Sequence, residues 1–269
     1  MVELRVARKA AAKIGLGLQY VLKEARVFDI WLKLGPIILS DSVSSQVTII
    51  CKGGTTLNKI FLKGTQRFSE DLDFDAFFLK ALSKREKIDF LDKNVVPSLR
   101  SSYQIEKPRL MRDVARFTCS FMNETGAKDS VFVEFNVEPN GPSEFELREA
   151  RSEILDIPTV RIPTYTFHVL VAKKLKTFYE RGSGKDLYDI YYSLKHIENV
   201  QEIIEALKKV LEAEEIEYKE FVSGFFSRLE DVEAIRRVHA STNPYVPREL
   251  RVSWVEIAKK IEEKFRDEL

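Results

Sequence analysis

Helical spacing of apolar residues marks two segments in the first hundred positions. Residues 4–34 place apolar side chains three and four positions apart and predict one or two amphipathic helices, which Gly35 and Pro36 are expected to end. Residues 80–100 show the same spacing up to a break at Pro97. Both segments are therefore expected to pack an apolar face against the rest of the protein.

Strands are predicted where β-branched or alternating residues replace that spacing. Residues 46–51 form a β-branched run, and residues 114–121 and 130–137 alternate between apolar and polar positions. The polar connection at residues 123–126 ends in a glycine and predicts a hairpin between the last two strands. The first half of the chain is therefore expected to contain a β-sheet flanked by helices.

From about Thr164 the pattern is helical almost to the end of the chain. A change of composition near residues 158–163 predicts a boundary there, between an α+β domain at residues 1–163 and a helical domain at residues 164–269. A length of 269 residues allows two domains without requiring them. The predicted fold class is α+β, with a mixed sheet followed by a mostly helical part.

A glycine pair follows the strand predicted at residues 46–51. The junction reads Lys52, Gly53, Gly54 and Thr55, and apolar residues recur at helical spacing after it. Glycines at a turn from strand to helix let backbone N–H groups converge on an anion. The turn is therefore a candidate cradle for a phosphate.

Two carboxylates stand close behind this turn in a β-like run. Asp71 and Asp73 lie two positions apart, so the period of a strand points both to one face. Such a pair can chelate Mg²⁺, which clamps a triphosphate. Glu134, in the strand predicted at residues 130–137, can add a third carboxylate if the two strands are neighbours. The alternative is an exposed glutamate on a half-solvated sheet.

The helical half carries a second polar group of residues. Lys174 and Arg181 fall inside or at the edge of an apolar helical stripe, whereas Lys173 and Lys176 are predicted to point away from it. Inward cations are costly unless they meet an anion, either a carboxylate of this protein or a bound phosphate. For Lys174, a side chain that extends along the helix to water is the simpler interpretation.

Two aspartates follow on the next predicted helix. Asp186 lies at the margin of its buried face and can either cap the helix or act in a site. Asp189 is predicted to lie nearer to solvent, where Lys185 is an ordinary surface partner. Asp186 is therefore the stronger candidate of the two.

The overall charge gives no attraction for polyanions, because 43 Lys and Arg oppose 42 Asp and Glu. Any contact with nucleic acid must come from local clusters. Cys51 and Cys119 match no metal-ligand spacing and are interpreted as reduced core thiols, with a disulfide as the alternative. A cytoplasmic protein without a membrane-spanning segment is expected, because no signal-peptide pattern and no run of about 18 apolar residues occurs.

Taken in order, these motifs resemble a known family. Lys-Gly-Gly-Thr-x-Leu, Arg-x-Ser-x-Asp-x-Asp, Ala-x-Lys-Leu-x-x-x-x-x-Arg and Lys-Asp-Leu-Tyr-Asp, between Lys52 and Leu194, resemble the motifs of AbiEii/AbiGii toxins, which include the mycobacterial MenT enzymes. The resemblance implies a DNA polymerase β-like nucleotidyltransferase fold with a helical domain closing the active site. Lys185, where arginine is usual, and Lys173, where an acidic residue is common, are departures.

The resemblance also implies roles for single residues. Those implied to bind the nucleotide are Lys52, Gly53, Gly54, Thr55, Arg67, Ser69 and Arg181. For Arg67 and Ser69 the alternative role is to orient the carboxylates. Those implied to be catalytic are Asp71, Asp73, Lys174 and Asp186, with Glu134 beside the aspartates as a further metal ligand.

The implied activity is transfer of a nucleoside monophosphate from an NTP to an acceptor hydroxyl, with release of pyrophosphate. Mg²⁺ or Mn²⁺ is the expected cofactor, tRNA the expected acceptor and an antitoxin protein a possible partner. Lys173, Lys176 and Lys185 are expected near an outward face, where they either meet an RNA backbone or are merely solvated. The alternatives are a phosphotransferase acting on a protein or small molecule, and a non-catalytic nucleotide- or partner-binding module.

Overall fold

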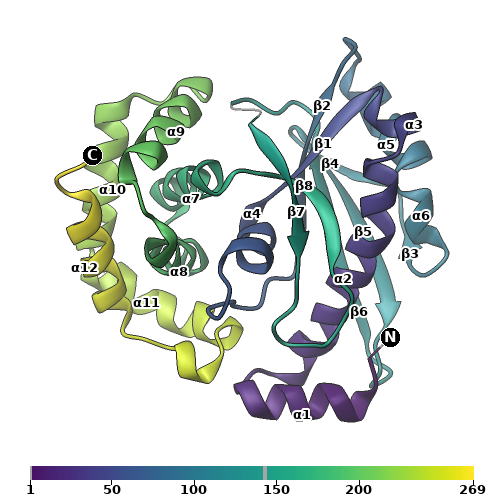
Figure 1. The fold of residues 1–269 in the computed structure, drawn as a ribbon, viewed down its shortest axis with the longest axis horizontal. Coiled ribbons are helices and arrows are strands. Elements are labelled where there is room, and N and C mark those ends of the chain that lie inside the picture. Colours follow the sequence, from purple (N-terminus) through teal and green to yellow (C-terminus); the bar gives the residue numbers. More distant parts are fainter. Residues whose placement is uncertain (1, 142–143) are drawn as a thin grey trace.

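The centre of the first half is a mixed β-sheet (Figure 1). The computed structural model describes residues 2–141 and 144–269, and within them eight strands follow the order β3-β5-β6-β2-β1-β8-β7, with β4 paired to β5. Their bounds are β1 Val47–Lys52, β2 Leu72–Phe78, β3 Gln104–Ile105, β4 Arg109–Met111, β5 Val114–Met122, β6 Lys128–Asn136, β7 Phe145–Ala150 and β8 Val160–Tyr165. Strand β2 is antiparallel to β1 and parallel to β6, which places the carboxylate strand in the middle of the sheet.

Helices pack beside the sheet and form nearly all of the second half (Figure 1). In the first half they are α1 Leu4–Ile14, α2 Leu18–Ile38, α3 Asp41–Ser44, α4 Gly53–Thr56 with its π-helical extension Leu57–Phe61, α5 Lys84–Asn94 and α6 Pro97–Arg100. In the second half they are α7 Phe167–Arg181, α8 Gly184–Ser193, α9 Val200–Ala213, α10 Tyr218–Glu230, α11 Val232–Thr242 and α12 Trp254–Phe265. Short 3₁₀ turns occupy Leu194–His196, Asn243–Tyr245 and Arg248–Leu250.

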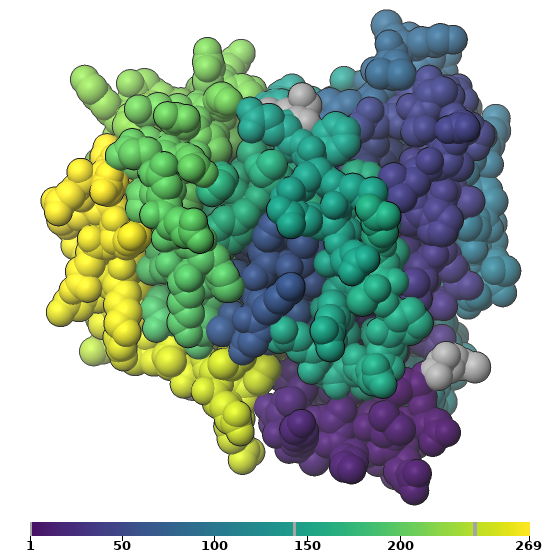
Figure 2. All heavy atoms as spheres, viewed as in Figure 1, coloured from purple at the N-terminus to yellow at the C-terminus, as the bar shows by residue number. Residues whose placement is uncertain are grey.

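Two large apolar cores meet at the helix that follows the glycines. One core packs α2, through residues such as Trp31, against the sheet, and the other joins helices α7 to α12. Leu57 contributes to the helical core and Ile60 to the sheet core. Figure 2 shows residues near 60, in blue, at the surface between the green helices and the teal strands. The glycine-turn helix therefore connects the two halves of the molecule.

The α+β prediction is confirmed, as are the hairpin, now β5 and β6, and the helical second half. The predicted end of the first helical segment is wrong, because α2 continues through Pro36 to Ile38. A proline near a C-terminus removes a single helical hydrogen bond, and burial of Ile38 in the sheet core favours the extra turn. Strands β7 and β8 were not predicted, since β7 is rich in charge and β8 contains Pro163. The division at residue 163 stays a prediction.

Candidate active site

The turn after β1 is built around two glycines that no other residue can replace without displacing a neighbour. Gly53 has a left-handed φ of 79°, and a Cβ atom there would lie 2.3 Å from Oδ2 of Asp73. A Cβ atom on Gly54 would lie 2.5 Å from Nη2 of Arg67. The turn therefore brings its backbone into direct contact with two of the predicted site residues.

Thr55 ties this turn to the segment that leads into the carboxylates. Its buried hydroxyl lies 2.7 Å from the Ser69 hydroxyl and within hydrogen-bonding distance of the backbone carbonyl of Asp71. Thr55 and Ser69 thus contact each other, as the carboxylate-orienting alternative for Ser69 requires. These two hydrogen bonds fix the position of Asp71 relative to the glycines.

The predicted alternation along β2 is confirmed. Leu72 and Phe74 lie in the sheet core, while Asp73 lies on the opposite face, directly across the strand pair from Lys52. The third aspartate of the run, Asp75, was not predicted as a site residue, yet it is buried and anchors three side chains. It accepts a hydrogen bond of 2.6 Å from the Tyr165 hydroxyl and pairs with Lys52 and, at 3.7 Å, with Lys173.

The two candidate metal ligands repel each other. Burial and the neighbouring charge of Asp73 raise the pKa of Asp71 from 3.8 to about 6. Burial also raises the pKa of Asp73, more than Lys52 lowers it. A pair of carboxylates whose ionised forms are both disfavoured is stabilised by a bound cation. This donor set therefore fits Mg²⁺.

Glu134 is the neighbour of Asp73 across the parallel pair of β2 and β6, as the sequence suggested. Its carboxylate is engaged by Arg116, whose Nε lies 2.5 Å from Oε1. Within the described ranges, no three His, Cys, Asp or Glu side chains gather closely enough to hold a metal ion. Mg²⁺ commonly binds through one or two carboxylates and completes its shell with water and substrate phosphates, so the aspartate pair is sufficient.

A cleft of about 260 Å³ opens between the glycine turn and helix α7. Its cationic lining residues are Lys52, Lys173, Lys174, Lys176 and Arg181, and its acidic ones are Asp73 and Glu214. The prediction that Lys173 and Lys176 point outward is wrong. Helix α9 and the sheet both pack beside α7, so the side of α7 assigned to solvent on a single-helix wheel faces the cleft.

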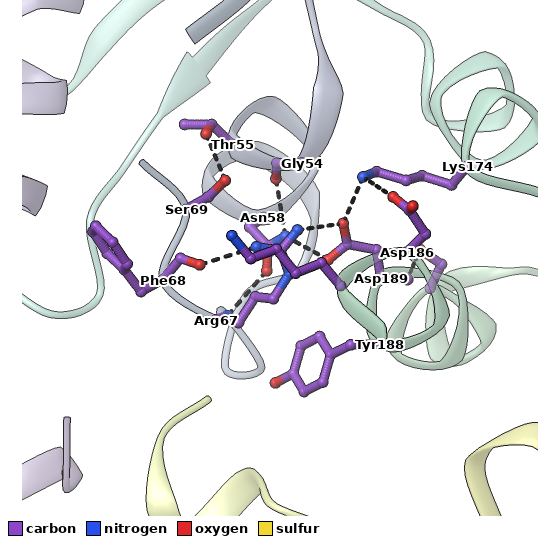
Figure 3. A network of polar contacts seen from close by, with 12 residues as sticks. Gly54, Thr55, Asn58, Arg67, Phe68, Ser69, Lys174, Asp186, Tyr188 and Asp189 are labelled. Atoms are coloured by element: carbon purple, nitrogen blue, oxygen red, sulfur yellow. Dashed lines mark hydrogen bonds and ion pairs between the residues drawn. The ribbon is translucent and has the colours of Figure 1, made fainter. Parts of the chain in front are cut away.

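Behind the cleft, a buried network of charges joins the two halves (Figure 3). Asp189 accepts hydrogen bonds from Arg67 at 2.8 and 2.7 Å and from Asn58 at 2.8 Å, and it pairs with Lys174 at 2.9 Å. Lys174 also donates to Asp186 at 2.8 Å. The anion that the inward lysine requires is therefore supplied by carboxylates of this protein.

The prediction that Asp189 lies near solvent is wrong, because its side chain is fully buried. The helical wheel assigned its face to water, but α8 packs there against α4 and its extension. Arg67, implied either to contact phosphates or to orient the carboxylates, is also buried, and its guanidinium donates to Asp189 and to the carbonyl of Phe68. Sequence reasoning missed Asn58, which donates to the carbonyl of Gly54 and accepts from the Arg67 amide. An asparagine among apolar helical positions was the available signal.

Arg181 is positioned differently from the rest of this network. Its guanidinium donates to both oxygens of Asp186, at 2.7 and 3.0 Å, but its side chain is 58% exposed and lines the cleft. Burial opposes ionisation of Asp186, yet Lys174 and Arg181 outweigh it and lower the pKa of Asp186 to about 2. Asp186 therefore orients the two cations at physiological pH.

Comparison with known proteins matches most of the chain to one family and to solved structures of similar fold. A family model described as "Nucleotidyl transferase AbiEii toxin, Type IV TA system" matches residues 40–268. A structure of MenT4, a nucleotidyltransferase toxin from Mycobacterium tuberculosis, is similar with a TM-score of 0.63 and 16% identity, covering 100% of this chain and 91% of that one. JHP933 from Helicobacter pylori aligns with a TM-score of 0.50 and 17% identity over 94% and 95% of the two chains.

The structural similarities show that the fold is shared, and the family match shows the class of protein to which the chain belongs. No curated protein sequence matches the chain. Among the helices of the described residues, none combines the length and apolar character needed to cross a membrane. Both cysteines, Cys51 and Cys119, are buried free thiols.

Proposed function

Because the chain belongs to the AbiEii family of nucleotidyl transferase toxins, we propose that it transfers a nucleoside monophosphate from an NTP to an acceptor hydroxyl. The acceptor oxygen bonds to the α-phosphorus, the bond from that phosphorus to the bridging oxygen breaks, pyrophosphate leaves and the hydroxyl proton passes to water. The observation that carries the proposal is the cationic cleft, which has Asp73 and the glycine turn at one wall.

The cleft suits a triphosphate by charge. Lys52 and Arg181 are the lining cations with substantial exposure, and each is held by a buried carboxylate, Asp75 for Lys52 and Asp186 for Arg181. Such preorganised cations stabilise the charge that develops as pyrophosphate leaves. We assign Lys174 a positioning role instead, because its ammonium group is shared between two aspartates.

Asp71 and Asp73 would hold Mg²⁺ or Mn²⁺. When bound, the ion polarises the phosphates and favours ionisation of the attacking hydroxyl. The chain's own contribution is to fix this pair against the phosphates. Thr55 fixes the backbone at Asp71, and Gly53 permits the close approach of Asp73.

The finer parts of the proposal are the acceptor, the partner and the location. RNA, and tRNA in particular, is proposed as the acceptor, in keeping with the motif resemblance. A cognate antitoxin protein is proposed from the family's description as part of a toxin-antitoxin system. A cytoplasmic location follows from the proposed substrates, since NTPs and tRNA are found there.

The test incubates the purified protein with total RNA, Mg²⁺ and each of the four NTPs, labelled at the α- or the γ-phosphate. Label from the α position in RNA, lost in Asp71→Asn and Asp73→Asn, supports the proposal. Label transferred only from the γ position identifies a phosphotransferase. No transfer with any nucleotide, by protein that binds NTP normally, overturns the proposed activity and favours a binding module.

A further inference from the structure

The two candidate metal ligands face different surroundings. Among the described residues, Asp73 lines the cationic cleft and Asp71 does not. The charges that act on Asp71 include Glu70 and Lys185, which lie outside that cleft. The two aspartates therefore have different neighbours, the cleft for Asp73 and the surroundings of Glu70 and Lys185 for Asp71.

Three aromatic rings gather beside Lys185. The ring of Phe68, which is fully buried, lies 5.0 Å from that of Tyr20 and 6.2 Å from that of Tyr245, and the two tyrosine rings are 5.1 Å apart. Both tyrosines remain partly exposed. They come from α2 and from the 3₁₀ turn Asn243–Tyr245, more than two hundred residues apart in the chain.

This cluster is connected directly to the aspartates. The backbone N–H of Phe68 donates a 2.7 Å hydrogen bond to the carbonyl of Tyr245, and Phe68 precedes Asp71 by three residues. The partly exposed tyrosines are therefore held in place beside the segment that leads to the candidate metal ligands.

Two lysines complete this surface. Nζ of Lys185 lies 3.6 Å from the centre of the Tyr245 ring, a cation–π contact. Lys185 and Lys23 both pair with Glu70, at 3.5 and 3.4 Å, and Lys23 also pairs with Asp129 at 2.9 Å. Partly exposed aromatic rings with adjacent cations are among the features by which proteins hold unpaired nucleotides.

We propose that Tyr20, Tyr245 and Lys185 form the acceptor platform, on which the terminal unpaired base of an RNA stacks while its hydroxyl reaches the α-phosphate past Asp71. The inference rests on the proposed function and adds the site of the second substrate. In phosphoryl-type transfer the attacking and leaving oxygens are roughly in line. With the triphosphate in the cleft beside Asp73, the proposal places the attacking hydroxyl on the side of Asp71, next to this platform.

The test compares variants that keep or remove the rings. Tyr245→Leu and Tyr20→Leu remove an aromatic face, while Tyr245→Phe and Tyr20→Phe keep it. Tyr218→Leu is the matched control, because Tyr218 is also half-buried and also lies under a lysine, with Lys208 at 5.3 Å, but it belongs to the helical half. Melting temperature and NTP affinity are measured for each to identify variants that fail to fold.

The leucine variants are expected to raise KM for the RNA acceptor at least about tenfold, the loss expected from one stacked base. NTP affinity, KM of the phenylalanine variants and KM of Tyr218→Leu should change less than about threefold. An unchanged acceptor KM in folded, NTP-binding leucine variants overturns the proposal. So does transfer of the nucleotide to a protein side chain in place of RNA.

A binding measurement separates this inference from the proposed activity. Fluorescence anisotropy with a labelled RNA hairpin that carries an unpaired 3′ end does not require turnover. If the wild type binds it more tightly than Tyr245→Leu but transfers no nucleotide, the activity proposal fails and the platform stands. If both proteins bind it equally, the platform is excluded whatever the activity.

Discussion

The carboxylate of Asp189 accepts two hydrogen bonds from the guanidinium of Arg67, at 2.8 and 2.7 Å, with both side chains withdrawn from solvent. The two residues are 122 positions apart. Arg67 begins the segment that carries Asp71, whereas Asp189 belongs to helix α8 of the second half. This pair therefore fixes the helical half to the strand that holds the candidate metal ligands.

Asp189→Asn should strongly destabilise the protein. The change keeps the side-chain shape but leaves the buried Arg67 guanidinium, which cannot lose its proton, without its counterion, at a cost of about 3–5 kcal/mol. Urea denaturation measures the loss. Glu230→Gln is the control, because Glu230 pairs with Arg266 at 2.9 Å on the surface, and should cost less than about 1 kcal/mol. Equal losses in the two variants would contradict a special role for the buried pair.

Asp71→Asn should stabilise the metal-free protein at pH 8. Folding raises the pKa of Asp71 from 3.8 to about 6, so the folded state binds the extra proton between those values and stability falls as pH rises through that range. Removing the charge should recover about 1–3 kcal/mol at pH 8, and the difference should vanish below about pH 4. Thermal unfolding across pH, without divalent ions, gives the comparison.

Mg²⁺ should make the wild type more stable than Asp71→Asn, the reverse of the order expected without metal. Bound metal relieves the repulsion between Asp71 and Asp73, so it should raise the melting temperature of the wild type and not that of Asp71→Asn. A similar Mg²⁺-dependent rise in both proteins would place the metal elsewhere. Asp73→Asn should behave in the same way as Asp71→Asn.

Arg181→Gln should weaken NTP binding with little loss of stability. The side chain is 58% exposed and lines the cleft, and Asp186 keeps Lys174 as a partner after the change. Calorimetric titration is expected to show about a tenfold loss of NTP affinity, the order of one charge-assisted contact. Normal NTP affinity in Arg181→Gln would refute the assigned contact.

In Lys174→Gln, by contrast, the buried aspartates lose their shared cation, so a marked drop in melting temperature should accompany any loss of activity.

Gly53→Ala should abolish activity while Gly126→Ala does not. Both glycines have left-handed backbones, with φ of 79° and 80°, so the intrinsic strain of alanine, about 1–2 kcal/mol, is the same at the two positions. A Cβ atom on Gly126 meets open space, whereas one on Gly53 meets the carboxylate of Asp73. Any excess loss of stability or activity in Gly53→Ala therefore reports the displacement of Asp73, and equal behaviour would show that this close approach is unimportant.

Local patterns were enough to locate the motif that contains the candidate metal ligands. The β-branched run, the glycine pair and the alternation around Asp73 each depend on neighbours a few residues away, and the structure has the strand, the turn and the alternation of Leu72, Asp73 and Phe74 as predicted. Strands whose sequences lack a regular alternation of apolar and polar residues were not predicted. Strand β8 pairs with the edge of β1 and β7 pairs with β8, and no local property of their sequences indicates this pairing.

The sequence by itself determined the fold class and the residues around the turn, because these follow from backbone preferences and short-range periodicity, and the resemblance of its ordered motifs indicated the family. Only the tertiary structure decided which charges face the cleft and which are buried. A helical wheel describes one helix in isolation. The surroundings of Asp189 and Lys173 depend on the residues of α4, α9 and the sheet that lie beside them. Burial of a charge is a property of the whole packing, since it requires partners such as Arg67 from far along the chain.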